Sequence, residues 1–130
     1  MTPDELKQRT KEFSLRCLKV VEALPRSVTG RTIAGQLARS ATSVAANYRA
    51  ACRARSRADF ISKIAVVEEE ADETAFWLEL AVEARVLPPG KVQPLSAEAE
   101  ELVKIFAASH ISATRRKNAP NQQSAISNQQ

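Results

Sequence analysis

The sequence predicts an all-α fold, an antiparallel up-down-up-down four-helix bundle. Only 5% of the residues are aromatic and three are glycine, whereas 44% are hydrophobic, many of them alanine. That composition favours helices over strands. Apolar residues also recur at three- and four-residue steps in four segments, and short connections rich in Pro, Gly or Ser separate these segments. The 130 residues suffice for one domain, which we place at residues 1–114.

The first helix is predicted to start after Thr2 and to end at Leu24. Thr2 can cap the helix, and Pro3 suits the first helical position. Asp4 and Glu5 then lie at the positive end of the helix dipole. The apolar inner face repeats at helical spacing, in the order Leu6, Phe13, Cys17, Val20 and Leu24.

The second helix is predicted from about Gly30 to Arg53, capped by Ser27 or Thr29. Its inner face occupies an arc of roughly 80° on a helical projection. That face consists of Ile33, Leu37, Ala41, Val44 and Tyr48. An arginine stripe lies on the opposite side, with no acid between its ends, and comprises Arg31, Arg39, Arg49, Arg53 and Arg57.

The third helix is predicted from Ser56, which can cap it, to about Arg85. Residues 86–90 follow with two prolines and a glycine, which are expected to stop it. Its core stripe should comprise Phe60, Ile64, Val67, Ala71, Leu78 and Val82. Acidic residues line both flanks of that stripe.

The fourth helix is predicted to begin at Ser96 as N-cap, after Pro94, and to fray near Thr114. Its inner face should comprise Leu102, Val103, Phe106 and His110. Residues 115–130 begin with three cations and continue as a polar stretch without periodicity. We expect this segment to be a basic, then polar, disordered tail.

Catalytic and metal sites are not indicated. The acidic cluster of residues 68–73 lacks the paired Glu-x-x-His motifs of a di-iron bundle, since His110 is the only histidine. The sequence shows no nucleophile elbow and no phosphate-binding glycine loop. Cys17 and Cys52 are expected to be free core thiols. We therefore expect no cofactor, no metal, no membrane segment and a cytoplasmic location.

The arginine stripe allows two interpretations. Arginine forks suit phosphates, so Arg39, Arg49, Arg53 and Arg57 are candidates for binding a nucleic-acid backbone. Alternatively, the same row could pair with carboxylates of the acidic third helix, within the chain or across a subunit boundary. The pattern alone does not choose between these interpretations.

The single tryptophan, Trp77, suggests an oligomer interface. It lies off the core stripe of the third helix, beside Glu70 and Glu73. Exposed tryptophan is enriched at protein interfaces. We therefore predict a homo-oligomer, cyclic in form, with Trp77, Glu70 and Glu73 near the contact.

The sequence also resembles a known family, the four-helix-bundle proteins named for intervening sequences of 23S rRNA genes. The resemblance covers residues 1 to about 112. It rests on Gln36-Leu37-Ala38-Arg39-Ser40, Ser43-Val44-Ala45-Ala46-Asn47, Arg57-x-x-Phe60, Ile64-Ala65 and Glu69-Glu70, followed by Leu78. The chain departs from the usual Asn-Ile-Ala-Glu-Gly, having Asn-Tyr-Arg-Ala-Ala at residues 47–51.

This resemblance implies a function without catalysis. The family is similar to the accessory protein of diversity-generating retroelements, which implies bundles packed side by side into rings, commonly homopentamers. It further implies binding or scaffolding associated with nucleic acid. The sequence thus favours a non-enzymatic oligomeric bundle that binds RNA or DNA backbone. The alternative is a homo-oligomeric scaffold with protein partners, whose charges serve only ring assembly.

Overall fold

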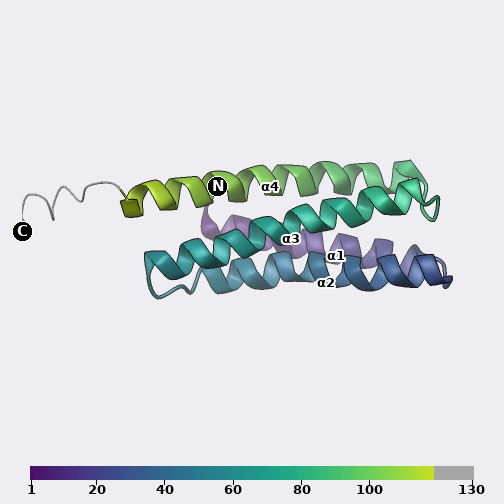
Figure 1. The fold of residues 1–130 in the computed structure, drawn as a ribbon, viewed down its shortest axis with the longest axis horizontal. Coiled ribbons are helices and arrows are strands. Elements are labelled where there is room, and N and C mark those ends of the chain that lie inside the picture. Colours follow the sequence, from purple (N-terminus) through teal and green to yellow (C-terminus); the bar gives the residue numbers. More distant parts are fainter. Residues whose placement is uncertain (119–130) are drawn as a thin grey trace, which may run out of the picture.

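The computed structural model of the chain describes residues 1–118, except for the side chain of Lys117. This part is all-α and consists of α1 (Pro3–Ala23), α2 (Val28–Ala51), α3 (Arg57–Glu83) and α4 (Pro89–Asn118). The chain reverses direction at each short connection, so that consecutive helices run antiparallel (Figure 1). The predicted four-helix bundle is confirmed. The predicted disordered tail lies, from residue 119 on, outside the described residues.

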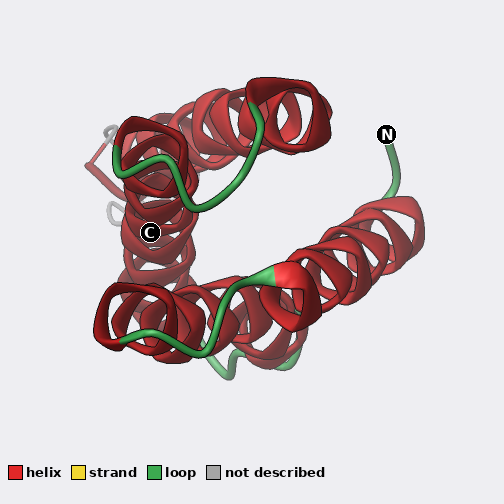
Figure 2. Cartoon of the chain, turned by 90° about the vertical axis from the view of Figure 1, so that its right-hand side faces the viewer, coloured by secondary structure: helices red, strands yellow, loops and turns green. Residues whose placement is uncertain are grey.

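The helices pack mainly against their neighbours in sequence. α2 contacts both α1 and α3, and α3 contacts α4 as well. The contact between α1 and α4 is the least extensive, and these two helices form the ends of the arrangement seen along the bundle (Figure 2). The α1–α2 pair and the α3–α4 pair are therefore two opposite halves of the molecule.

The first three helices begin where their capping residues predict. Thr2 Oγ1 accepts from the N–H of Glu5 at 3.1 Å, and Glu5 Oε1 accepts from the N–H of Thr2 at 2.7 Å, which completes a capping box. Ser27 rather than Thr29 caps α2, through the N–H of Gly30 at 3.0 Å. Ser56 caps α3 through the N–H of Asp59.

The fourth helix is longer than its sequence suggests. It begins at Pro89 instead of Ser96, contains Pro94, and continues to Asn118 instead of fraying at Thr114. Proline at the first position costs no hydrogen bond, and the added turns bury Val92 and Leu95. Burial of these two side chains offsets the loss of one backbone hydrogen bond at Pro94. Arg115 and Arg116 consequently belong to α4 and not to a tail.

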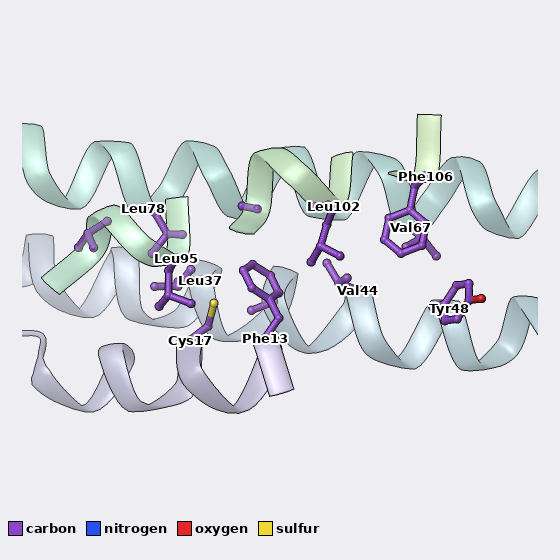
Figure 3. Packing of buried hydrophobic residues seen from close by; sticks show 14 of the residues in the cluster. Phe13, Cys17, Leu37, Val44, Tyr48, Val67, Leu78, Leu95, Leu102 and Phe106 are labelled. Atoms are coloured by element: carbon purple, nitrogen blue, oxygen red, sulfur yellow. The ribbon is translucent and has the colours of Figure 1, made fainter. Parts of the chain in front are cut away.

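The core follows the predicted inner faces and is continuous along the bundle (Figure 3). Tyr48 and Phe106 link α2 to α4 with their ring centroids 5.4 Å apart. Phe60 is only half-buried, contrary to expectation, because α1 begins short of the end of the bundle where α3 starts (Figure 1). The predicted residues that are fully or almost fully buried are Ile33, Leu37, Val44, Ile64, Val67, Leu78 and Phe106.

Small polar residues join the helices inside this core. Thr74 Oγ1 donates to Ser40 Oγ at 3.0 Å between α3 and α2, and Ser14 Oγ donates to the carbonyl of Ala41 at 2.6 Å between α1 and α2. These bonds satisfy hydroxyls that have almost no access to water. The two cysteines are free, but only Cys17 is buried; Cys52 is exposed, so the expectation of two core thiols is wrong for it. Burial raises the pKa of the Cys17 thiol to about 12, which keeps it protonated and unreactive.

Candidate nucleic-acid interface

A basic hollow lies between α2 and α3, beside the connection of residues 52–56. Its cations are Arg49 from the last turn of α2, Arg53 and Arg55 from the connection and Lys63 from α3. We call Arg49, Arg53 and Arg55 the basic surface. Arg57 is exposed at the first position of α3 but does not line the hollow.

One acid lines this hollow, and it already has partners. Asp59 accepts from Lys63 Nζ at 2.7 Å and from the N–H of Arg55 at 3.3 Å. The bond from Lys63 has the larger effect, and together the two bonds hold the pKa of the Asp59 carboxyl below its usual value. Within residues 1–118, no carboxylate lies within ion-pair distance of the three arginines of the basic surface. Their guanidinium groups are thus free to bind an anion.

Arg39, by contrast, is held within the chain. Its guanidinium pairs with Glu70 at 3.2 Å and also with Glu73. Trp77 Nε1 donates to Glu73 Oε2 at 3.0 Å, and the bonds from Trp77 and Arg39 hold the pKa of Glu73 below its usual value. These four side chains form a single network between α2 and α3. For Arg39, the structure therefore has the intramolecular pairing that was the alternative interpretation of the stripe.

The arginine stripe is divided by this network. Arg39 precedes Arg49 by ten residues, or about 15 Å along a helix. Arg49 and Arg53 lie together in the basic hollow, whereas Arg39 and Arg57 do not line it. Contact of Arg39 or Arg57 with a nucleic acid stays a prediction.

Trp77 is less exposed than the sequence indicates. It is half-buried and packs against the core, while its neighbour Phe76 is 50% exposed. The two rings meet edge to face, with centroids 5.0 Å apart. A role for Trp77, Glu70 and Glu73 at a subunit contact stays a prediction, but Phe76 is the better candidate for an apolar anchor.

Helical periodicity does not single out Arg55 or Phe76. Arg55 lies outside the helices, so a helical projection does not place it, although the Arg-x-Arg-x-Arg run at residues 53–57 was a visible signal. Phe76 adjoins Trp77 in the sequence, and only the packing of α3 shows which of the two rings turns outward. Local sequence alone therefore does not show that Arg55 lines the hollow or that Phe76 is exposed.

Within the described residues, other kinds of site have little support. No group of three or more His, Cys, Asp and Glu side chains in residues 1–118 could hold a metal ion. His110 Nδ1 lies 3.5 Å from Glu68 Oε1 on the outer side of α3 and α4, which is a two-residue contact. In the same part of the chain, no helix combines the length and the apolar character that crossing a membrane requires.

Comparison with known proteins places the chain in a family. A family model described as "23S rRNA-intervening sequence protein" matches residues 4–108. A solved structure from Bacteroides thetaiotaomicron, described as a protein with unknown function from the S23 ribosomal protein family, is 31% identical. The match covers 80% of this chain and 96% of that chain, with a TM-score of 0.75. No curated protein matches. The chain belongs to the 23S rRNA-intervening sequence protein family.

Proposed function

We propose that the chain is a non-enzymatic, self-associating bundle that binds nucleic-acid backbone through Arg49, Arg53 and Arg55. The proposal rests on one observation, the unpaired arginines of the basic surface. Three arginines lie together without a carboxylate partner within the described residues, and Lys63 neutralises the acid beside them. The description of the family, which refers to 23S rRNA, agrees with a nucleic-acid setting.

The chemistry of the basic surface favours phosphate over base recognition. Each guanidinium presents a planar fork of donors that fits two phosphate oxygens. None of the residues that line the hollow is aromatic, so it has no platform for stacking unpaired bases. We therefore expect binding to RNA or DNA that is independent of sequence and sensitive to salt.

The salt dependence of binding provides the test. Each phosphate contact on duplex DNA contributes about −0.9 to the slope of log K against log salt. Arg49→Gln and Arg53→Gln should each flatten that slope by about one unit, measured by fluorescence anisotropy with a labelled duplex. Arg31→Gln is the matched control, because Arg31 is an exposed arginine at the other end of α2 from the hollow. Arg115, Arg116 and Lys117 are present in every variant, so their effect cancels in the comparison.

A specific observation also supports the second candidate, a scaffold with protein partners. The Arg39 network shows that an arginine of α2 can be held by carboxylates of α3. If carboxylates of a neighbouring copy hold Arg49 and Arg53 in the same way, Arg49→Gln and Arg53→Gln will lower the oligomer mass. The salt slope will then be the same in these variants, the control and the wild type, which would contradict the nucleic-acid proposal.

A further inference from the structure

A second hollow adjoins the basic hollow, in the groove between α1 and α2. Arg49 and Arg53 line both of them, so that their side chains form a ridge with one hollow on each side. Lys7 and Lys11 of α1 line the same groove as the two arginines. Because α2 packs against α1 on one side and α3 on the other, the basic surface continues across α2 onto α1.

The register of the helices brings cations from both hollows to one level of the bundle. Ser14 Oγ donates to the carbonyl of Ala41 at 2.6 Å between α1 and α2. Lys7 is seven residues before Ser14, and Arg49 is eight residues after Ala41. These two cations are therefore nearly level, because the helices run antiparallel. On the other side of α2, Lys63 lines the basic hollow with Arg49. A row of cations thus crosses three helices instead of following one.

The lysines of the α1–α2 groove are available to an anion. Within residues 1–118, no carboxylate lies within ion-pair distance of Lys11. Lys7 pairs with Asp4 at 3.2 Å, but the side chain of Asp4 is 91% exposed. An ion pair so accessible to water is weak, so that a phosphate group can replace the carboxylate.

The shape and the lining residues of the two hollows favour a double-stranded ligand. Two hollows that flank one ridge match the two backbones that border a groove of a duplex. A single strand has one backbone, and proteins that hold it commonly supply aromatic rings on which its bases stack. None of the residues that line either hollow is aromatic. A duplex does not need such rings, because its bases already stack on one another.

We propose that the protein binds double-stranded nucleic acid with the two backbones on opposite sides of the ridge. Phosphates of one strand lie in the basic hollow, and those of the other strand lie in the α1–α2 groove, where Lys7 and Lys11 contact them. Arg49 and Arg53 lie between the strands, where the negative potential of a duplex groove attracts arginine. This inference rests on the proposed function and adds to it the strandedness of the ligand and two binding residues.

The salt dependence of duplex binding tests the two lysines. Lys11→Gln should flatten the slope of log K against log salt by about one unit, and Lys7→Gln combined with Lys11→Gln by about two units. Fluorescence anisotropy with a labelled DNA duplex measures these slopes. Lys19→Gln is the matched control, because Lys19 is an exposed lysine of α1 that lines neither hollow. Its slope should equal that of the wild type. Circular dichroism verifies that each variant is folded.

A labelled single strand of the same length tests the arrangement of the strands. Its one backbone can occupy the basic hollow alone, so Lys11→Gln should change its slope by less than about half a unit. Arg49→Gln should flatten the slopes of both the duplex and the single strand, because Arg49 lines both hollows. Equal flattening of the two slopes by Lys11→Gln would overturn the two-strand arrangement.

Two further results would overturn the inference: an unchanged duplex slope in both lysine variants, or a lower oligomer mass of these variants by sedimentation. The second result would show that a neighbouring copy covers the α1–α2 groove. Arg49→Gln and Arg53→Gln judge the proposed function separately. If they flatten the duplex slope and the lysine variants do not, the basic surface binds nucleic acid without α1. If they too leave the slope unchanged, the proposed function itself fails.

Discussion

At the scale of single residues, Gly30 shows how closely the chain packs at the start of α2. A Cβ atom added there would lie 1.9 Å from the carbonyl oxygen of Pro25, which is backbone and cannot turn aside. Gly35, in the middle of the same helix, has nothing within 4 Å of its added Cβ. Gly30 is therefore required because a side chain does not fit there, whereas Gly35 only weakens the helix.

The two glycines make opposite predictions. Gly30→Ala should lower the free energy of unfolding by about 1–3 kcal/mol, because the Pro25 backbone must move. Gly35→Ala should raise it by about 0.5–1 kcal/mol, because alanine is the better helix former. Urea denaturation of both variants measures the difference. If both substitutions stabilise the protein equally, the close contact at Pro25 does not exist.

The candidate site could be predicted only in part, and Arg39 and Arg49 show why. On a helical projection both lie on the same side of α2, and the sequence shows this correctly. Their partners depend on which turn of α3 lies opposite each of them. Glu70 and Glu73 lie opposite Arg39, whereas the neighbour of Arg49 is the hollow that holds Lys63. The offset of two helices along their axes is set by core packing and loop length, so local sequence does not predict it.

At the scale of elements, local sequence predicts the starts of the first three helices and misses the start of the fourth. Thr2, Ser27 and Ser56 cap α1, α2 and α3 because a hydroxyl near the first turn satisfies a free backbone N–H. The predicted start of α4 at Ser96 is wrong, because Pro88-Pro89-Gly90 is typical of a segment that ends a helix. Here Pro89 is instead the first residue of a new helix, which burial of Val92 stabilises. Such tertiary packing is invisible to a local pattern.

The end of α3 carries an unusual residue. Arg85 has a φ of 61°, the left-handed conformation that normally belongs to glycine after a helix. The N–H of Val86 bonds to the carbonyl of Ala81, and the N–H of Arg85 bonds to that of Val82, which together form a Schellman motif. An arginine in this conformation costs free energy that a glycine would not.

Arg85→Gly is therefore expected to stabilise the protein by about 0.5–1 kcal/mol. The preceding residue, Ala84, has an ordinary helical φ of −78°, so that Ala84→Gly should destabilise by a similar amount. Thermal melts of the two variants should shift in opposite directions. A lower melting temperature for Arg85→Gly would show that its side chain contributes more than its backbone costs.

At the scale of the whole molecule, charge is divided between the two halves of the bundle. A groove between α1 and α2 is lined by one acid and four cations, Asp4, Lys7, Lys11, Arg49 and Arg53. A groove between α3 and α4 is lined by four acids, Asp72, Glu79, Glu83 and Glu100. A net charge of +4 hides this division, because it adds the two halves together. The division gives the molecule two faces of unlike charge.

The two halves meet least between α1 and α4, and one ion pair bridges them there. Arg9 donates to both oxygens of Glu98, at 2.7 and 2.8 Å, and the side chains are 29% and 19% exposed. Such a bidentate pair is stronger than an ordinary surface pair because it is partly shielded from water and fixed in geometry. It is therefore expected to hold the first turns of α1 against α4.

Arg9→Gln should lower the free energy of unfolding by about 1–2 kcal/mol, because it leaves Glu98 partly buried without its partner. Lys63→Gln is the control: it removes the pair with Asp59, which lies within one helix and is more exposed, and should cost only about 0.3–0.5 kcal/mol. Hydrogen exchange should locate the effect, with faster exchange of α1 amides than of α3 amides in Arg9→Gln. A double-mutant cycle with Glu98→Gln isolates the coupling. A coupling energy near zero, or equal exchange in α1 and α3, would show that burial of Leu6 and Phe13 alone fixes α1.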